Sequence, residues 1–334
     1  MSALDVKAIN VPHQQLHDDV FPLVQALDNP TATLDDMKGW ITRNKETLLD
    51  ALSTHGAILF RGFPIDGAED FDQAIRAFGM DSFTYKESLS NAVRVNKTEL
   101  VFTANEAPPE VSIFLHHEMA QTPLFPSRLF FCCEKAPDAD GETPLCRSDI
   151  LLEKLDQSAP QFVADCERLG VKYSNVMPAD DDPNSGQGRS WKSTLDTDDK
   201  VAAEARLEKL GYDYQWQADG SLRATTPALP AIRTLKDGRR VFFNQLIAAF
   251  RGWKDARNSP QKSISFGDGS TIPTEAMDIA IRLADELSFD LAWQAGDIAL
   301  IDNYLVMHGR RPFQGTRRVL ASLVADDGTR LAEI

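Results

Sequence analysis

Two histidines and one glutamate in this sequence have the types and spacing of a metal site. His116 and Glu118 lie on either side of His117, directly after the apolar run IFL, and His308 follows a second apolar run far downstream. Because successive side chains of a strand point to opposite faces, an extended segment here would place His116 and Glu118 on one face. Two imidazoles and one carboxylate form the facial set that suits iron(II) and leaves positions open for other ligands. The pattern therefore predicts an iron site at His116, Glu118 and His308.

The HxE spacing alone is weak evidence, because a histidine and a glutamate at a strand end can also form a satisfied polar pair. Thr143, in the run Gly-Glu-Thr-Pro, and Arg318, at the start of an expected last strand, favour the metal site. An organic diacid that chelates iron through its 2-oxo acid end needs a cation and a hydroxyl for its distal carboxylate. We therefore expect Thr143 and Arg318 to bind such a co-substrate, and the neighbouring Arg317 to be structural.

The elements around these residues predict a mainly β core with helical padding. Thr33 and Asp36 form a capping box that predicts a helix ending at Gly56, and a second helix is expected to end at Gly79. Strands are expected at 57–60, 112–117, 129–134, 240–244, 298–303 and 318–323, and further helices at 149–157, 161–169, 199–210 and 274–287. Few strands are followed by a helix at the spacing of βαβ units, so an antiparallel β sandwich or barrel is favoured over a doubly wound sheet.

The composition is that of one globular domain, 1–334. The 334 residues are 43% hydrophobic and 25% charged, and the net charge of −15 argues against a nucleic-acid partner. No apolar run approaches the roughly 20 residues that span a bilayer, and the first residues do not resemble a secretory signal. The four cysteines have no disulfide or zinc spacing and are expected to be reduced and mostly buried: Cys132, Cys133, Cys146 and Cys166. We expect a cytoplasmic protein without a membrane partner, and the oligomeric state stays open, a homo-oligomer included.

A polar stretch at about 178–272 is predicted to be an insertion in this domain, with a hairpin around Gly220. Long polar insertions are commonly either functional lids or surface excursions. We expect at least part of it to cover the site, with 178–200 as a mobile segment. Three of its residues could contact a substrate: Arg189, Trp191 and Lys192. The aspartate run 180–182 could face a cationic substrate or belong to a solvated loop.

Four landmarks of the sequence resemble the taurine dioxygenase/clavaminate synthase superfamily (TauD/TfdA-like). They are GAILFRGF (56–63), FLHHEMAQTP (114–123), LFFCCEKAPDADGETPL (129–145) and GDIALIDNYLVMHGRRPFQGTRR (296–318), and they occur in family order. The resemblance leaves about the first 50 residues and the middle insertion without a counterpart. It implies a double-stranded β-helix (jelly roll) with flanking helices. It also implies that His116, Glu118 and His308 hold Fe(II), and that Thr143 and Arg318 bind 2-oxoglutarate.

Two positions depart from the taurine dioxygenase pattern. Taurine dioxygenase-like members have aspartate at the position of Glu118. Clavaminate synthase and the asparagine and arginine hydroxylases have glutamate there, as this chain does. Ser322 lies four residues after Arg318, where both named branches carry a second arginine for the anionic group of the substrate. The residue that anchors the substrate is therefore not identified, and Arg310, which resembles a recurrent family position, has no assigned role. The phrase LHHEMAQTPLFPSRLFFCCE resembles the subset that acts on amino acids or amino-acid-derived molecules.

The leading hypothesis is a dioxygenase that hydroxylates an amino-acid-like small molecule in specialised metabolism. It would consume dioxygen and 2-oxoglutarate and release succinate and carbon dioxide, with the hard chemistry carried by the metal and co-substrate. Desaturation and cyclisation stay open. A related halogenase is disfavoured, because those enzymes replace the carboxylate with a small residue and this chain has Glu118. A non-enzymatic, cupin-like β barrel that binds small molecules would not need Thr143 and Arg318 at matching distances.

Overall fold

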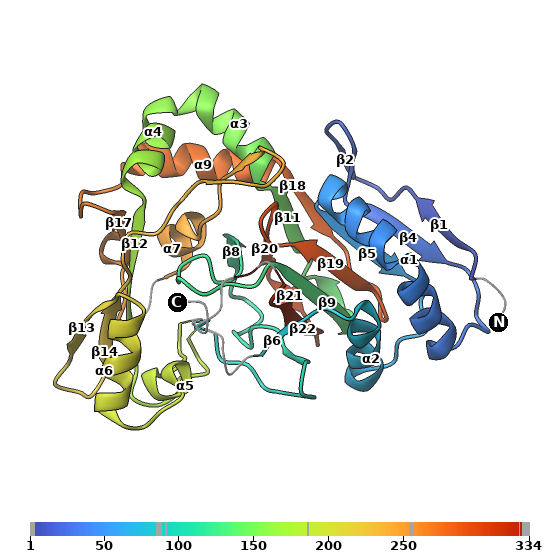
Figure 1. Ribbon diagram of the computed structural model, residues 1–334, viewed down its shortest axis with the longest axis horizontal. Helices are drawn as coiled ribbons and strands as arrows, with labels where there is room; N and C mark the ends of the chain where they lie inside the picture. Colours follow the sequence, from blue (N-terminus) through green and yellow to red (C-terminus); the bar gives the residue numbers. More distant parts are fainter. Residues whose placement is uncertain are drawn as a thin grey trace.

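Two β-sheets form the centre of the molecule (Figure 1). The structure is a computed structural model that describes residues 4–84, 89, 90, 92–185, 187–253, 257–326 and 328. The larger sheet has the order β1 (Val6–Ile9), β4 (Leu23–Leu27), β5 (Ala57–Arg61), β19 (Ile298–Asp302), β9 (Arg128–Lys135), β22 (Arg318–Val324) and β6 (Ser82–Phe83), and β7 (Phe102–Thr103) also pairs with β22. The smaller sheet has the order β18 (Ser288–Leu291), β11 (Thr143–Arg147), β20 (Val306–Arg310) and β8 (Ile113–His116). Apart from the parallel pair β4–β5, the strands of both sheets pair antiparallel.

Both faces of the larger sheet are buried. In β9, Leu129, Phe131 and Cys133 belong to the core between the two sheets, whereas Phe130 and Cys132 belong to the core under the helices. Those helices are α1 (Leu34–His55) and α2 (Ala68–Phe78), which cover this face of the sheet (Figure 1). A strand that is covered on both sides needs apolar residues at every position, which explains the all-apolar runs of β5, β9 and β19.

Helix α1 begins as the sequence predicts. The backbone N–H of Asp36 donates to Thr33 Oγ1 over 3.2 Å, and the N–H of Thr33 donates to Asp36 Oδ2 over 3.1 Å. The helix ends at Gly56, whose φ of 76° is a conformation that glycine adopts readily. The chain then enters β5 directly, so the cap fixes where this strand starts.

Four helices cover the outer face of the smaller sheet. They are α3 (Ser148–Ser158), α4 (Pro160–Leu169), α7 (Leu246–Gly252) and α9 (Thr274–Glu286). Leu115, Cys146 and Met307, from three strands of this sheet, pack in one core with these helices. Leu145 and Val306, which are next to Cys146 and Met307 in sequence, belong instead to the core between the sheets.

A further sheet lies outside the sandwich, at the left of Figure 1. Its order is β13 (Asp213–Trp216), β14 (Leu222–Thr225), β12 (Val171–Met177) and β17 (Ile264–Phe266), and α5 (Trp191–Leu195) and α6 (Lys200–Lys209) lie beside it. The expected hairpin around Gly220 is confirmed, because β13 and β14 pair across it. The remaining short elements are β2 (Gln15–Leu16), β3 (Val20–Phe21), β10 (Ala139–Asp140), β15 (Arg233–Thr234), β16 (Arg240–Val241), α8 (Pro260–Ser263) and β21 (Phe313–Gln314).

Most of the elements that the sequence predicted have their observed bounds within two residues of the expected ones, but β11, β18 and β20 of the smaller sheet were not predicted. The expected strand at 240–244 is shorter than predicted, because β16 ends at Val241 and the chain turns into α7 soon afterwards. The four cysteines are free and buried, as expected. Within the described residues, the helices are all too short or too polar to cross a membrane.

Candidate active site

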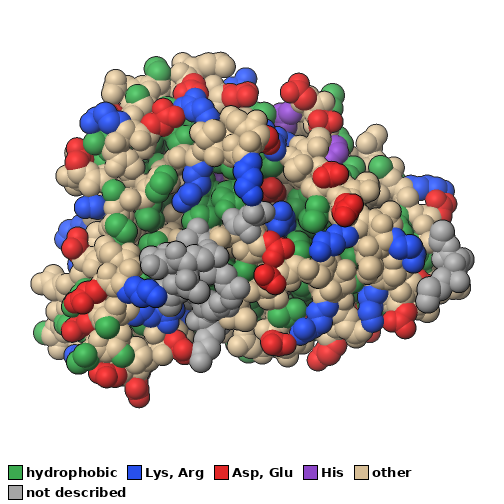
Figure 2. Space-filling view, in the orientation of Figure 1, with side chains coloured by type: hydrophobic (Ala, Val, Ile, Leu, Met, Phe, Trp, Pro, Cys, Tyr) green, Lys and Arg blue, Asp and Glu red, His purple; other side chains and the backbone are tan. Residues whose placement is uncertain are grey.

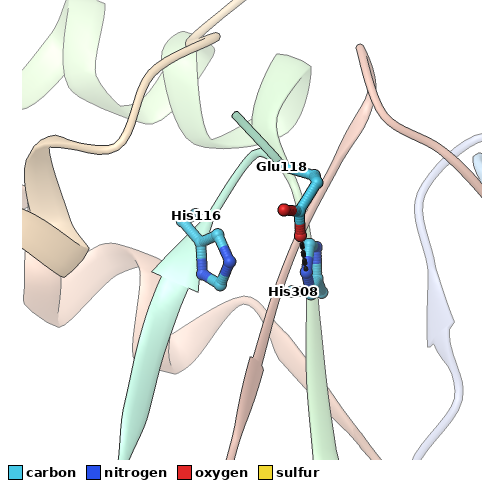
Figure 3. A group of neighbouring side chains, drawn as sticks. All are labelled: His116, Glu118 and His308. Carbon is cyan, nitrogen blue, oxygen red and sulfur yellow. Dashed lines mark ion pairs between the residues drawn. The ribbon is translucent and has the colours of Figure 1, made fainter. Parts of the chain in front are cut away.

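His116, Glu118 and His308 come together in the space between the sheets (Figure 3). Each offers one ligand atom, and these atoms all lie within 4.8 Å of one another. His116 ends β8 and lies directly opposite His308 of the neighbouring strand β20. The carboxylate oxygen Oε2 of Glu118 lies 3.6 Å from His308 Nε2.

Glu118 does not lie on the strand that carries His116. β8 ends at His116, and Glu118 lies in the turn that follows, so the expectation of one continuous pleat was wrong. Asn303, just after β19, holds this turn in place. Its Oδ1 accepts from the Glu118 N–H over 2.8 Å, and its Nδ2 donates to the carbonyls of Glu118 and Pro126 over 3.0 and 2.7 Å. The Glu118 carboxylate reaches the histidines because the buried side-chain amide of Asn303 fixes the backbone of Glu118.

His117 points away from the other two histidines and is fully buried. Its Nδ1 contacts the carbonyl of Asn303, and its ring lies 4.8 Å from that of Phe243. Burial lowers the pKa of His117 to about 3, so the ring is neutral. His117 is therefore a buried residue that supports the site from behind the two candidate ligands.

The protonation states of His116 and Glu118 suit a divalent metal. Burial, and after it the nearby His308, lowers the pKa of His116 to about 4. Its Nδ1 lies 2.8 Å from the carbonyl of Phe114. Because a carbonyl oxygen accepts hydrogen bonds, Nδ1 carries the ring proton and Nε2 is left to bind a metal. Burial alone would raise the pKa of Glu118, but Arg94 and His308 more than offset it and hold that pKa well below its usual range. The ionised Glu118 carboxylate and the neutral His116 imidazole, together with the second imidazole of His308, form the donor set that fits iron(II).

The structure places Arg317, not Arg318, beside Thr143. Arg317 Nη2 donates to Thr143 Oγ1 over 3.0 Å, and its Nε donates to the carbonyl of Gly141 over 2.8 Å. Arg317 and Thr143 line the same cavity as the three candidate metal ligands. The side chain of Arg318 is 57% exposed and donates to Glu134 over 2.6 Å. The predicted co-substrate role of Arg318 therefore does not fit its exposed position, and the neighbouring Arg317 becomes the candidate for that role.

The error arises because β22 is buried on both faces. Val319 and Ala321 face the core between the sheets, whereas Leu320 faces the core under α1 and α2. Arg317, the residue directly before β22, lines the same cavity as Val319. With this register, the residue four positions beyond the co-substrate arginine is Ala321 and not Ser322.

Arg310 has a role that the sequence did not assign. Its guanidinium is buried and donates to the carbonyls of Ala107, Pro108 and Val111 over 2.6–2.8 Å. Burial lowers the pKa of Arg310 to about 10, so the group stays charged at neutral pH. It therefore holds the segment 105–111 against the cavity.

Part of the expected insertion reaches the site, but not the residues that the sequence singled out. Gln187 lines the cavity, and Asn184 and Ser185 line an adjoining hollow at its mouth. Figure 2 shows the molecule hollowed near the centre of this face, with acidic and basic side chains on its rims. The three residues expected to contact substrate lie elsewhere: Arg189 is buried against the carbonyl of Ser193, Trp191 packs on Trp216, and Lys192 pairs with Asp180.

The aspartate run of this segment makes local contacts instead of facing the cavity. Asp181 accepts from the N–H of Ser190 over 2.7 Å, and Asp182 pairs with Arg257 over 3.0 Å. These contacts favour the loop interpretation of the run over the interpretation in which it meets a cationic substrate.

The sequence also missed several polar side chains that line the cavity. They come from segments far apart in the chain: Arg94, Asn105, Gln121, Gln187 and Gln245. Arg94 contacts a candidate ligand directly, since its Nη2 donates to Glu118 Oε1 over 3.0 Å. Gln121 lies in the landmark 114–123, which assigned it no role. No motif marks the other four residues, because loops have no periodic pattern.

Comparisons with known proteins agree with this site and fold. The family described as "Taurine catabolism dioxygenase TauD, TfdA family" matches residues 19–323. A clavaminate synthase-like protein of Arabidopsis thaliana is 42% identical over 318 residues, which cover 93% of this chain and 96% of that protein. The dapdiamide synthesis protein DdaC of Enterobacter agglomerans is 28% identical over 287 residues, which cover 82% and 84%.

A solved structure shows the same fold at low sequence identity. Asparagine oxygenase in complex with Fe(II), hydroxyasparagine and succinate superposes with a TM-score of 0.55 at 12% identity, over 87% of this chain and 83% of that one. The two-sheet core is consistent with the jelly roll expected from the sequence. Since the family match extends over most of the chain, this protein belongs to the TauD/TfdA family of iron(II)- and 2-oxoglutarate-dependent dioxygenases.

Proposed function

We propose that this dioxygenase oxidises an amino-acid-like small molecule, with His116, Glu118 and His308 as its iron ligands. One observation carries the proposal. The three ligand atoms lie within 4.8 Å of one another, in a cavity that Thr143 and Arg317 also line. The resemblance to enzymes of amino-acid chemistry supports the substrate class, as does the asparagine oxygenase that shares the fold.

When bound, iron(II) and 2-oxoglutarate supply the oxidising chemistry, which consumes dioxygen and yields succinate and carbon dioxide. The protein's own contribution begins with Arg317. The carbonyl of Gly141 and the hydroxyl of Thr143 orient its guanidinium. Burial lowers the pKa of Arg317 to about 10, so it remains a cation at neutral pH. A fixed guanidinium beside a hydroxyl is a suitable partner for the distal carboxylate of the co-substrate.

The insertion at about 178–272 would close the site from one side. Gln187 already lines the cavity, and Asn184 and Ser185 stand at its mouth. Excluding water from such a site protects the reacting groups and strengthens the electrostatic contacts inside it. We assign this closing role to the segment around 184–187. We treat residues 1–334 as a single domain that contains this segment.

The test begins with the purified protein freed of metal. Adding iron(II) and 2-oxoglutarate without oxygen should produce the visible charge-transfer band of the chelated co-substrate. With oxygen present, succinate release should rise when the right compound is supplied from a set of free amino acids and small peptides. If no band forms, a cupin-like binding protein becomes the better account.

The product separates the alternatives that remain within the enzyme class. Hydroxylation adds one oxygen atom to the substrate, whereas desaturation and cyclisation each remove two hydrogen atoms. Mass spectrometry of the product therefore decides between insertion and removal, and its NMR spectrum separates a ring from a double bond.

A further inference from the structure

Three arginines line the cavity among the described residues, and two of them donate to neutral groups of the protein. Arg310 donates to backbone carbonyls of the segment 105–111. Arg317 is held by Gly141 and Thr143 and faces the expected co-substrate. The third, Arg94, comes from the loop that precedes β7 and lies directly against the candidate metal ligand Glu118.

Arg94 is almost completely enclosed but only partly paired. Its side chain is 7% exposed, and its Nη2 donates to both oxygens of Glu118 over 3.0 and 3.2 Å. Its guanidinium also lies 5.2 Å from the centre of the Phe102 ring. Its Nε is buried and has no hydrogen-bond partner among the described residues. A buried N–H without a partner costs stability unless a ligand satisfies it, so this donor points to a bound acceptor.

Gln121 supplies the complementary group. It is 5% exposed and lines the same cavity, and its Oε1 is buried without a hydrogen-bond partner in the described part of the chain. An amide oxygen accepts hydrogen bonds and does not repel a cation. Among the described residues that line the cavity, Arg94 and Arg310 thus each have an unused Nε donor, and Gln121 has an unused acceptor. Of the two donors, that of Arg94 belongs to the guanidinium that contacts Glu118.

The charge of the cavity favours an anionic group. The chain as a whole carries −15, yet the described residues that line the cavity include three arginines and a single carboxylate, that of Glu118. The charges of iron(II) and of the 2-oxoglutarate dianion cancel, so loading the enzyme leaves this positive excess in place. A site of one sign with low-dielectric walls attracts a ligand of the other sign.

We propose that Arg94 binds the α-carboxylate of the substrate and that Gln121 accepts from its α-ammonium group, so that the site takes free α-amino acids. This inference rests on the proposed function. It narrows the substrate class to amino acids whose α-carboxylate and α-ammonium groups are both free. Gln121 also lines a second, largely apolar cavity, with Tyr173, Leu207 and Trp253 among its walls. The amino-acid side chain would extend toward it.

The experiment compares free L-amino acids with their carboxamides and their N-acetyl derivatives. Binding is read from the thermal stabilisation of the protein loaded with Mn(II) and N-oxalylglycine, which occupy the site without turnover. We expect at least one free amino acid to bind the wild type about tenfold or more tightly than either derivative. Arg94→Gln should bind acid and carboxamide alike, and Arg94→Lys should keep part of the preference. Gln121→Leu should lose the preference for the free amine.

Arg94 also touches Glu118, so the test must separate a substrate contact from support of the metal. The charge-transfer band with iron(II) and 2-oxoglutarate reports metal and co-substrate binding, and it should be unchanged in the Arg94 variants. The matched control is Arg168→Gln, an exposed arginine that pairs with Asp165 on α4. The control should bind every compound as the wild type does.

Two results would overturn the proposal. The wild type could fail to prefer any free amino acid over its derivatives, or the Arg94 variants could lose the band while the acid preference persists. In the second case Arg94 only positions Glu118. If the wild type itself forms no band, the failure belongs to the proposed function and not to the assignment of Arg94.

Discussion

Arg317 donates a hydrogen bond to the hydroxyl of Thr143 over 3.0 Å, across a sequence separation of 174 residues. The next residue, Arg318, makes its contact with Glu134 at the surface. Two adjacent arginines thus have opposite environments, one inside the cavity and one in solvent. This contrast provides a matched pair of substitutions.

Arg317→Ala should raise the KM for 2-oxoglutarate by roughly a hundredfold, because a buried carboxylate would lose its cation. Arg318→Ala should change the KM little, since an exposed ion pair contributes little free energy. Succinate release measured against 2-oxoglutarate concentration gives both values. The opposite ranking would restore Arg318 as the co-substrate ligand.

Replacing any one of the iron ligands should abolish turnover without unfolding the protein. His116→Ala, Glu118→Ala and His308→Ala each remove one donor from the set that converges in the structure. Iron content after reconstitution and the circular dichroism spectrum separate loss of metal from loss of fold. A variant with normal iron content and full activity would exclude its residue from the site.

His117→Ala should have a different signature. His117 is fully buried and its Nδ1 contacts the carbonyl of Asn303, so its removal should lower the free energy of unfolding by about 1–3 kcal/mol. Turnover should fall far less than in the ligand variants, because the ring points away from the metal site. Loss of iron at an unchanged melting temperature would contradict this assignment.

The segment 178–200 should respond to a filled site. Gln187 lines the cavity, so closure over substrate should slow hydrogen exchange in this segment when iron, 2-oxoglutarate and substrate are all present. In the protein without ligands, we expect this to be the most protease-sensitive region. Unchanged exchange at 178–200, together with protection near His116, would leave the segment a surface excursion.

Asp302 should make the stability depend on pH. Burial raises the pKa of Asp302 to about 6, against an ordinary value of 3.8. The folded state therefore holds a proton between these two values that the unfolded state has lost. This residue's contribution to stability is complete below pH 4 and is lost as the pH rises through 6.

The variant Asp302→Asn has no such titration. Its melting temperature, relative to that of the wild type, should increase between pH 4 and about pH 6 and then level off. Thermal unfolding in a series of buffers measures this difference. If the difference in melting temperature between the variant and the wild type stays constant across this pH range, Asp302 does not titrate as expected.

The sequence revealed those parts of the site that leave a local signal. His116 and Glu118 stand close together, the capping box at Thr33 is local, and the apolar runs of the larger sheet mark strands that are buried on both sides. The same double burial hid the register of β22, because a strand that is apolar on both faces does not reveal which of two adjacent arginines points inward. Local patterns therefore located the elements but not the orientation of this strand.

Other parts of the site have no local signal at all. Asn303 holds Glu118 across a separation of 185 residues, and Arg94 reaches it from a loop without periodicity. Neither contact could be inferred from spacing along the chain. They follow from the packing of the two sheets, which brings these segments to one place.

The bond between Asn303 and Glu118 also bears on how the protein folds. Contacts between such distant parts of the chain form slowly, since a long loop must close before the contact gives any stability. The metal site should therefore be completed late in folding, once β8 and β20 have paired. Iron that binds only the finished site cannot accelerate the earlier steps, but it stabilises the folded state by mass action. Its main kinetic effect should be slower unfolding, so that loss of iron shortens the lifetime of the native protein without changing how quickly it forms.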